Sequence, residues 1–400
     1  MCVKTMNALF LDIGRGPAVR SAGITVTERM GKMAQKAYLL LENGRYFEGV
    51  NFGAPVTDHT GELVFTTGVE GYIETLTDPS YSGQIVVQTF PLIGNYGIIP
   101  EDFESSRVWM TAYVVKEWCQ EPSNYRCAGD LDTFLKAQNI PGISGVDTRT
   151  LTKIIREAGS MNAMITSRKP PYTPAEVEAL KEYRVTGAVE RVSPKKMETF
   201  PAEGERKYRV ALWDFGAKTN IRRELQKRGC EVIDMPAGTK AEEIAALGAD
   251  GLMLTNGPGD PSDNADIIRE IRKTVDTGIP TFGICLGHQL MALAMGGKTG
   301  KMKFGHRGGN QPVKDLKTGR VYISSQNHGY EVLGDTLPDT ARVSFINVND
   351  GTCEGVDYLD RPAFTVQFHP EACSGPHDTR FMFGRFADMM DKHKSGKEDA

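Results

Sequence analysis

The sequence predicts an α/β protein in two parts: a strand-rich α+β domain, then a doubly wound, mostly parallel α/β domain. Three observations lead to this prediction. The first half carries an Asn-Gly hairpin signal among several strand-like runs, residues 191–207 are rich in proline and charge, and regular alternation of strands and helices follows them. A chain of 400 residues is also longer than one ordinary domain.

The first half opens with the hairpin signal, because Asn43-Gly44 separates two apolar runs. A capping box follows later, where Thr173 and Glu176 flank a proline at the first helical position of a helix that runs to about residue 183. Further strands are expected at residues 62–66, 84–89 and 108–115, and helices at 131–138 and 150–158, the second ended by Gly159.

The second half alternates apolar strands with amphipathic helices. Strands are expected at residues 210–215, 232–235, 251–255 and 281–285, and helices at 220–228, 241–247 and 265–276. This rhythm is typical of a parallel sheet covered by helices on both faces, where ligands bind beyond the carboxyl ends of the strands.

The composition excludes several classes of protein. Lys and Arg total 47 against 51 acidic residues, and this near-balance argues against a nucleic-acid binder. No apolar run reaches the roughly 20 residues of a membrane helix. The seven cysteines form no Cys-x-x-Cys pair, so reduced thiols and a cytoplasmic location are expected. Residues 1–32 are expected to be an extension of unknown role rather than a signal peptide.

Cys285 is the candidate nucleophile. It stands between Gly283 and Gly287 where an apolar strand meets a helix, which is the pattern of a nucleophile elbow. The helix N-terminus is expected to favour the thiolate and lower the pKa of this cysteine. The alternative is a buried structural cysteine, and the flanking glycines argue against it.

His369 and Glu371 are the candidate base and orienting carboxylate. They follow another apolar strand and are separated by Pro370, so both side chains can lie at the end of that strand. A surface histidine and a metal-binding pair are the alternatives, but no further cluster of acids and histidines completes a metal site, so no metal is expected.

The loop of residues 256–261 has two glycines around a proline, Gly257 and Gly259. Its backbone amides, together with the amide of Leu286, are expected to stabilise a tetrahedral oxyanion. Taken alone, this composition is also that of a common turn.

These three motifs together resemble the class I (triad) glutamine amidotransferase domain, and they occur in that family's chain order. The rest of the chain resembles the small subunits of carbamoyl-phosphate synthetase. The stretches that carry this second resemblance are residues 65–72, 76–84, 94–97, 141–152 and 325–330, and the whole match runs from about residue 33 to 391.

The resemblance implies that Cys285 forms a glutamyl thioester and releases ammonia, with His369 and Glu371 completing the triad. It also implies oxyanion contacts from Gly259 and Leu286. The residues implied to contact glutamine are Gly68, Gly257, Gly259, Leu286, Gln289, Asn327, Gly329 and Tyr330. Many relatives have serine at Gly68, where only backbone can serve here, and Tyr330 replaces a commoner phenylalanine.

The resemblance further implies a partner, the large subunit, which receives ammonia through an internal channel. There, bicarbonate and two ATP, with Mg, yield carbamoyl phosphate for arginine and pyrimidine synthesis. No cofactor is expected in this chain itself. Its nearest approach to a P-loop, residues 296–299, lacks the first glycine and follows a helix, so it predicts only a helix stop.

The expected organisation is an extension at 1–32, a small-subunit domain at 33–190, a linker at 191–207 and the amidotransferase domain at 208–395. Three alternatives remain: an amidotransferase serving another synthetase, a non-catalytic regulatory relative, and a free-standing cysteine hydrolase. The strand-rich first half argues against the first and the last, and the intact triad motifs argue against the second.

Overall fold

The computed structural model describes residues 35–396, and from Lys36 onward they form one unit. The extension expected at residues 1–32 lies outside the described residues. Within the described part, no helix is both long and apolar enough to cross a membrane.

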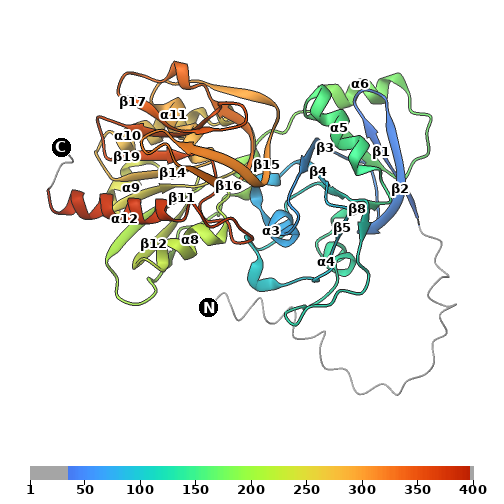
Figure 1. Cartoon of the computed structure of the whole chain (residues 1–400), viewed down its shortest axis with the longest axis horizontal. Coiled ribbons are helices and arrows are strands. Elements are labelled where there is room, and N and C mark those ends of the chain that lie inside the picture. The colour runs from blue at the N-terminus through green and yellow to red at the C-terminus, as the bar shows by residue number, and fades with distance from the viewer. Residues whose placement is uncertain (1–34, 397–400) are drawn as a thin grey trace, which may run out of the picture. The chain divides into compact units, whose positions relative to one another are not determined.

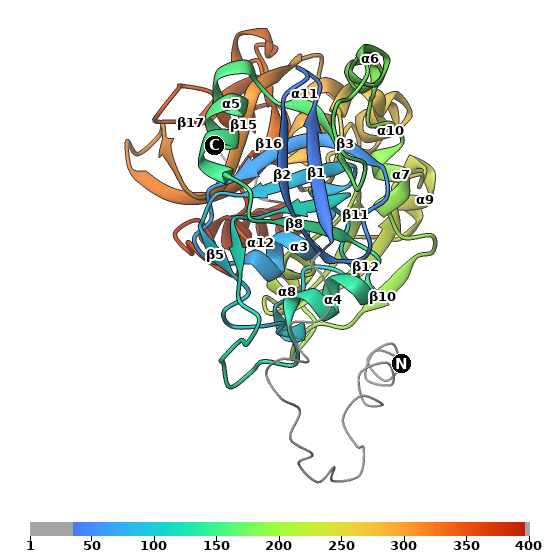
Figure 2. The same cartoon turned by 90° about the vertical axis from the view of Figure 1, so that its right-hand side faces the viewer.

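The first half of the described chain is built on a closed barrel of seven strands (Figures 1 and 2). The predicted hairpin is confirmed, since β1 and β2 pair antiparallel with Leu40 opposite Tyr46. Closure of the barrel was not predicted, because it depends on parallel pairings between strands far apart in sequence. The barrel order is β1 (Lys36–Leu41), β2 (Tyr46–Gly53), β8 (Pro141–Ser144), β6 (Ala112–Val114), β4 (Gln84–Gln88), β3 (His59–Thr66) and β9 (Met161–Thr166).

Short helices and turns connect the barrel strands. The predicted capping box is present, because Thr173 accepts from the Glu176 amide and Glu176 accepts from the Thr173 amide. The strand expected at residues 108–115 forms only at β6. The other elements of this half are α3 (Tyr72–Thr77), α4 (Leu131–Ala137), α5 (Thr148–Ala158), α6 (Pro174–Glu182), α7 (Ala188–Val192), η1 (Pro79–Tyr81), η2 (Pro100–Asp102), and the paired β5 (Leu92–Ile93) and β7 (Glu117–Trp118).

The second half contains a ten-stranded sheet whose centre is parallel, which confirms the predicted fold class. The parallel strands are, in spatial order, β12 (Cys230–Pro236), β11 (Tyr208–Asp214), β13 (Gly251–Leu254), β14 (Thr281–Ile284) and β19 (Ala363–Val366). The segment predicted as a linker contains β10 (Glu198–Phe200), which pairs antiparallel with β12 at the edge of the sheet.

Helices cover both faces of this sheet, as a doubly wound fold requires. Buried side chains of α8 and α12 pack in one apolar cluster, and those of α9, α10 and α11 pack in the other. The helices are α8 (Thr219–Gln226), α9 (Ala241–Ala246), α10 (Ala265–Val275), α11 (Leu286–Ala294) and α12 (Phe381–Lys394), with turns η3 (Pro261–Asp263) and η4 (Gly334–Thr336).

An antiparallel extension completes the sheet and was not predicted. It consists of β15 (Thr299–Asp315), β16 (Val321–Val332), β17 (Ala341–Asn347) and β18 (Cys353–Tyr358). The sequence of β15 is polar and glycine-rich with no regular alternation, so it gave no strand signal. The helix stop predicted at residues 296–299 is confirmed, because α11 ends at Ala294 and Gly296 has a φ of 92°.

The barrel and the sheet meet along this extension. The amide of Thr67, just after β3, donates to the carbonyl of Arg307 on β15 at 3.2 Å. Two side-chain contacts also join the two halves. Asn327 of β16 donates to Asp78 at 3.0 Å, and Asn256, in the loop after β13, donates to Ser80 at 2.9 Å. Both halves therefore contribute to the surroundings of the strand ends.

Candidate active site

Cys285 sits at a sharp turn between β14 and α11. Its φ of 53° and ψ of −104° are strained for a residue with a side chain, as a nucleophile elbow requires. A Cβ at Gly287 would lie 2.3 Å from the carbonyl oxygen of Leu254, and one at Gly283 would lie 2.8 Å from Cγ2 of Thr365. The two glycines are therefore needed for close backbone packing around the elbow.

The sheet brings His369 and Glu371 to the same edge as Cys285. Strands β14 and β19 are parallel neighbours, and the Cys285 amide donates to the carbonyl of Val366 at 2.9 Å. His369 Nδ1 lies 2.6 Å from Glu371 Oε1, and both side chains are fully buried. The Nε2 atom of His369 has no hydrogen-bond partner within the described chain. This imidazole is thus oriented by a carboxylate and has a free nitrogen that could take up a proton.

The Cys285 thiol points to backbone in this structure. It donates to the carbonyl of Asn327 at 3.7 Å, and within residues 35–396 it makes no hydrogen bond to His369. Burial raises the pKa of Cys285 to about 12, although Lys218 and the Leu286 amide act to lower it. The expectation of a lowered pKa was therefore wrong, because burial outweighs the helix N-terminus. The resting thiol is protonated and needs a base.

Lys218, just before α8, carries the buried positive charge of the site. Its Nζ lies 3.4 Å from Glu371 Oε1 and 3.6 Å from Asp78 Oδ2. Burial acts to lower the pKa of Lys218, but Asp78, Glu371 and Glu104 outweigh it and the pKa is raised. Lys218 is thus charged at neutral pH and links the triad carboxylate to the barrel.

The carboxyl groups near Lys218 differ in their protonation. Burial acts to raise the pKa of Glu371, but His369 and Lys218 outweigh it and lower the pKa to about 2. Burial raises the pKa of Glu104 to about 7, in spite of Lys218 and of the hydrogen bonds that Asn220 donates. Glu371 is therefore the carboxylate that stays ionised beside His369.

A cavity of about 610 Å³ opens onto Cys285. Of the residues expected to contact glutamine, those that line it are Gly257, Gly259, Gln289, Asn327, Gly329 and Tyr330. Leu286 and Gly68 do not line it. Gly68 lines a neighbouring cavity of about 390 Å³, to which Asn327, Lys218 and Asp78 also contribute. Asn327 thus borders both cavities.

Gln289 is held in place one helical turn after Cys285. Its Nε2 donates to the carbonyl of Tyr330 at 2.8 Å and to Gln367 Oε1 at 2.9 Å. These bonds hold the Gln289 side chain against β16 and against the residue that follows β19.

The oxyanion site is expected to be formed by the backbone amides of Leu286 and Gly259. The Leu286 amide lies beside the Cys285 sulfur, where it acts to lower the pKa of the thiol. The amide of Gly259 donates to no backbone carbonyl in the part of the chain that the structure describes, and Gly259 has a φ of 89°. A Cβ at Gly257 would lie 2.3 Å from the Phe215 carbonyl oxygen, so glycine lets this loop approach β11.

The chain matches two known families over most of its length. Residues 39–165 match the family described as carbamoyl-phosphate synthase small chain, CPSase domain, and residues 211–389 match glutamine amidotransferase class-I. The carbamoyl phosphate synthase small chain of Bacillus caldolyticus is 51% identical over 358 residues, 89% of this chain and 96% of that protein. This chain belongs to the carbamoyl phosphate synthase small chain family.

Other small chains are similar to the same extent. That of Fusobacterium nucleatum subsp. nucleatum is 50% identical over 89% of this chain and 98% of that protein. That of Symbiobacterium thermophilum is 46% identical over 88% of this chain and 98% of that protein. The family resemblance inferred from the motifs is thereby confirmed.

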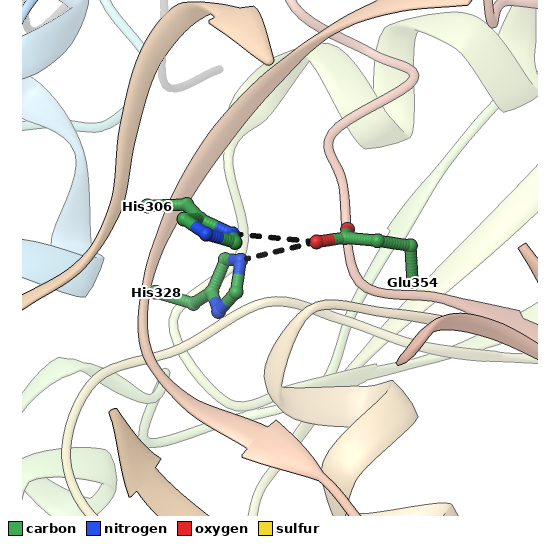
Figure 3. A group of neighbouring side chains, drawn as sticks. All are labelled: His306, His328 and Glu354. Carbon is green, nitrogen blue, oxygen red and sulfur yellow. Dashed lines mark ion pairs between the residues drawn. The ribbon is translucent and has the colours of Figure 1, made fainter. Parts of the chain in front are cut away.

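One group of described residues in this family member has the donor set of a metal site: His306, His328 and Glu354, whose ligand atoms lie within 4.8 Å of one another (Figure 3). His306 also pairs with Asp350 at 2.8 Å and lies 3.4 Å from Glu354. Burial acts to lower the pKa of His306, but the two carboxylates outweigh it and raise it. Burial raises the pKa of Glu354, and His306 contacts both Glu354 and Asp350 in this buried network.

Sequence reasoning missed the Lys218–Asp78 ion pair and Arg307, which lines the cavity of about 610 Å³. A signal existed for Lys218, because it follows the carboxyl end of β11 at the same sheet edge as Cys285. Asp78 reaches the site through barrel–sheet contacts, and Arg307 reaches it through the pairing of β15 with β16. No local pattern in the sequence indicates either.

Proposed function

We propose that this chain is the glutamine-hydrolysing subunit of a carbamoyl phosphate synthase and that Cys285 is its nucleophile. The observation that carries the proposal is the strained elbow of Cys285 on the strand next to the buried His369–Glu371 pair. Family membership supports the reaction, and the site supports the assignment of these residues.

In the proposed reaction, His369 Nε2 accepts the proton of Cys285, and the sulfur attacks the carboxamide carbon of glutamine. The amides of Leu286 and Gly259 stabilise the oxyanion that forms. His369 then returns the proton to the leaving nitrogen, the C–N bond breaks and ammonia departs, leaving a glutamyl thioester.

Water completes the reaction. His369 removes a proton from water, and the hydroxide attacks the thioester carbon. The C–S bond then breaks as His369 returns the proton to sulfur, which gives glutamate and the Cys285 thiol. Glu371, ionised at neutral pH, holds the imidazole in the tautomer whose Nε2 can accept a proton in each half-reaction.

We further propose that glutamine binds in the cavity of about 610 Å³, with contacts from Gly257, Gly259, Gln289, Asn327, Gly329 and Tyr330, which line it. The Leu286 amide would add a backbone contact beside the Cys285 sulfur. Gly68 would contribute backbone only, from the neighbouring cavity. That second cavity, beyond Asn327, is the proposed start of the route by which ammonia reaches a large subunit, where ATP and Mg would be used.

The test is ammonia and glutamate release by the wild-type chain and by Cys285→Ala, each with and without a large subunit. Loss of the thiol should lower kcat by several orders of magnitude. Cys119→Ala is the matched control, since Cys119 is a half-buried thiol elsewhere in the barrel half. Wild-type rates in Cys285→Ala would refute the assignment. We expect the large subunit to speed glutamine hydrolysis, and equal rates with and without it would refute this coupling.

A further inference from the structure

Arg307 is a buried cation with little to neutralise it. Arg307 is only 4% exposed, and its Nη1 donates to the carbonyl of Phe304 at 2.6 Å. The Nε atom has no hydrogen-bond partner, and no carboxylate of the described residues lies within ion-pair distance of the guanidinium.

The nearest acid is already engaged. Glu62 pairs with Lys301 at 2.8 Å and accepts from Gln84 at 2.9 Å. Burial acts to lower the pKa of Arg307, yet an arginine remains protonated in proteins. A buried guanidinium with unused donors is costly to a folded protein, and an anion that enters its surroundings would remove that cost.

The guanidinium faces the cavity of the proposed glutamine site. Arg307 lies on β15 opposite Asn327 of β16, and it lines the same cavity as Cys285. A Cβ at Gly329 would lie 3.1 Å from Nη2 of Arg307, so glycine at this position leaves the guanidinium open on that side. Two hydrogen bonds from Thr67 to the Arg307 carbonyl, at 3.2 and 2.9 Å, fix its backbone.

We propose that Arg307 binds the α-carboxylate of glutamine and thereby selects amino-acid amides over amides without that group. The inference rests on the proposed function, which places the carboxamide of glutamine against Cys285. The α-carboxylate is then the one anionic group of the substrate, and a guanidinium offers it two parallel hydrogen bonds in a fixed geometry. Binding of the substrate supplies the missing counter-charge.

The test compares L-glutamine with its α-amide, in which a neutral carboxamide replaces the α-carboxylate. Ammonia release is followed for wild type, Arg307→Met and Arg307→Lys, each with its large subunit. For Arg307→Met we expect the KM for glutamine to rise by about 30-fold to about 1,000-fold with kcat nearly unchanged. The preference for glutamine over the α-amide should fall by a similar factor. The KM of Arg307→Lys should lie between those of wild type and Arg307→Met, because lysine keeps the positive charge but cannot form two parallel hydrogen bonds.

Arg320→Met is the matched control for the same chemical change, since Arg320 is exposed, lies over the Tyr322 ring and lines neither cavity. Its KM should stay within about fivefold of wild type. Thermal midpoints and alkylation of Cys285 by iodoacetamide, which needs no carboxylate site, show whether Arg307→Met is folded with an intact thiol.

The outcomes separate this inference from the proposed function. A wild-type chain that does not hydrolyse glutamine contradicts the proposed function itself. If the wild type is active and Arg307→Met lowers kcat without raising KM, or loses activity on glutamine and its α-amide equally, Arg307 does not bind the α-carboxylate.

Discussion

Substitution of Gly287 by alanine tests the elbow geometry most directly. The added Cβ would lie 2.3 Å from the carbonyl oxygen of Leu254 and 2.7 Å from its carbonyl carbon, whereas ordinary contacts begin at 3.4 Å. The obstructing atoms are backbone atoms at the end of β13, which cannot rotate away. The turn or the strand must therefore move by about 1 Å to relieve the clash.

The size of the effect follows from this overlap. Overpacking of a well-packed core costs about 1–3 kcal/mol of unfolding free energy, and a backbone clash belongs at the upper end. The turn that moves also carries Cys285, and a misplacement of about 1 Å at a reacting group costs about 100-fold in rate. We therefore expect Gly287→Ala to lose about 2–3 kcal/mol of stability and about 100-fold in kcat.

Gly384→Ala is the matched control for the same chemical change. Gly384 lies within α12, and a Cβ there would meet nothing within 4 Å. Alanine should stabilise that helix by about 0.5–1 kcal/mol and leave glutaminase activity unchanged. Urea denaturation and ammonia release measure both quantities. Wild-type stability and kcat in Gly287→Ala, or equal losses in the two variants, would refute the reasoning.

Three further substitutions test the charge network and a distant helix cap. Lys218→Met leaves two buried carboxylates without their cation, so urea denaturation at neutral pH should show a loss of about 3–5 kcal/mol; an unchanged midpoint would contradict this. Because His369 and Lys218 outweigh burial and lower the pKa of Glu371 to about 2, its ionised form stabilises the protein above the unfolded carboxyl pKa of about 4.3, and this stabilisation is lost as the pH falls through about 2. The stability difference between wild type and Glu371→Gln should therefore shrink below about pH 4, and a constant difference would argue against the pairing. Thr173→Ala removes the side-chain cap of α6 and should cost about 1 kcal/mol while glutamine hydrolysis continues at the wild-type rate.

The features that were predicted correctly depend on residues close together in the sequence. The glycines around Cys285 mark a turn whose packing excludes any side chain, and the capping box at Thr173 closes its own hydrogen bonds. The alternation of strands and helices after residue 207 predicted the parallel centre of the sheet, because each strand and helix there buries a continuous apolar face.

The parts that were not predicted depend on long-range contacts. The barrel closes through parallel pairs such as β6 with β8, which have no turn signal between them. The sequence of β15 has no apolar alternation, and its strand conformation depends on pairing with β16 and β17. Asp78 and Asn327 meet across 249 positions of sequence, so neither residue indicates the other.

The wrong prediction for the pKa of Cys285 has the same origin. A position at a helix N-terminus can be read from the sequence, and it favours the thiolate. The degree of burial cannot be read from the sequence. Because Cys285 is only 3% exposed, burial has the largest effect on its pKa. A neutral thiol at rest suits a subunit whose chemistry should begin only with substrate in the cavity, because His369 can then take the proton as the new bond forms.

The charges around Lys218 explain why the barrel half belongs to the active site. Lys218 and Glu371 are on the sheet, while Asp78 is on the barrel and contacts both Lys218 and Asn327. Without the barrel, Asn327 would lose the carboxylate that orients its side chain, and Lys218 would keep Glu371 as its remaining partner at 3.4 Å. The carbonyl of Asn327 also accepts the hydrogen bond of the Cys285 thiol. A change in the position of the barrel would therefore reach the nucleophile through two contacts, Asp78 to Asn327 and Asn327 to Cys285.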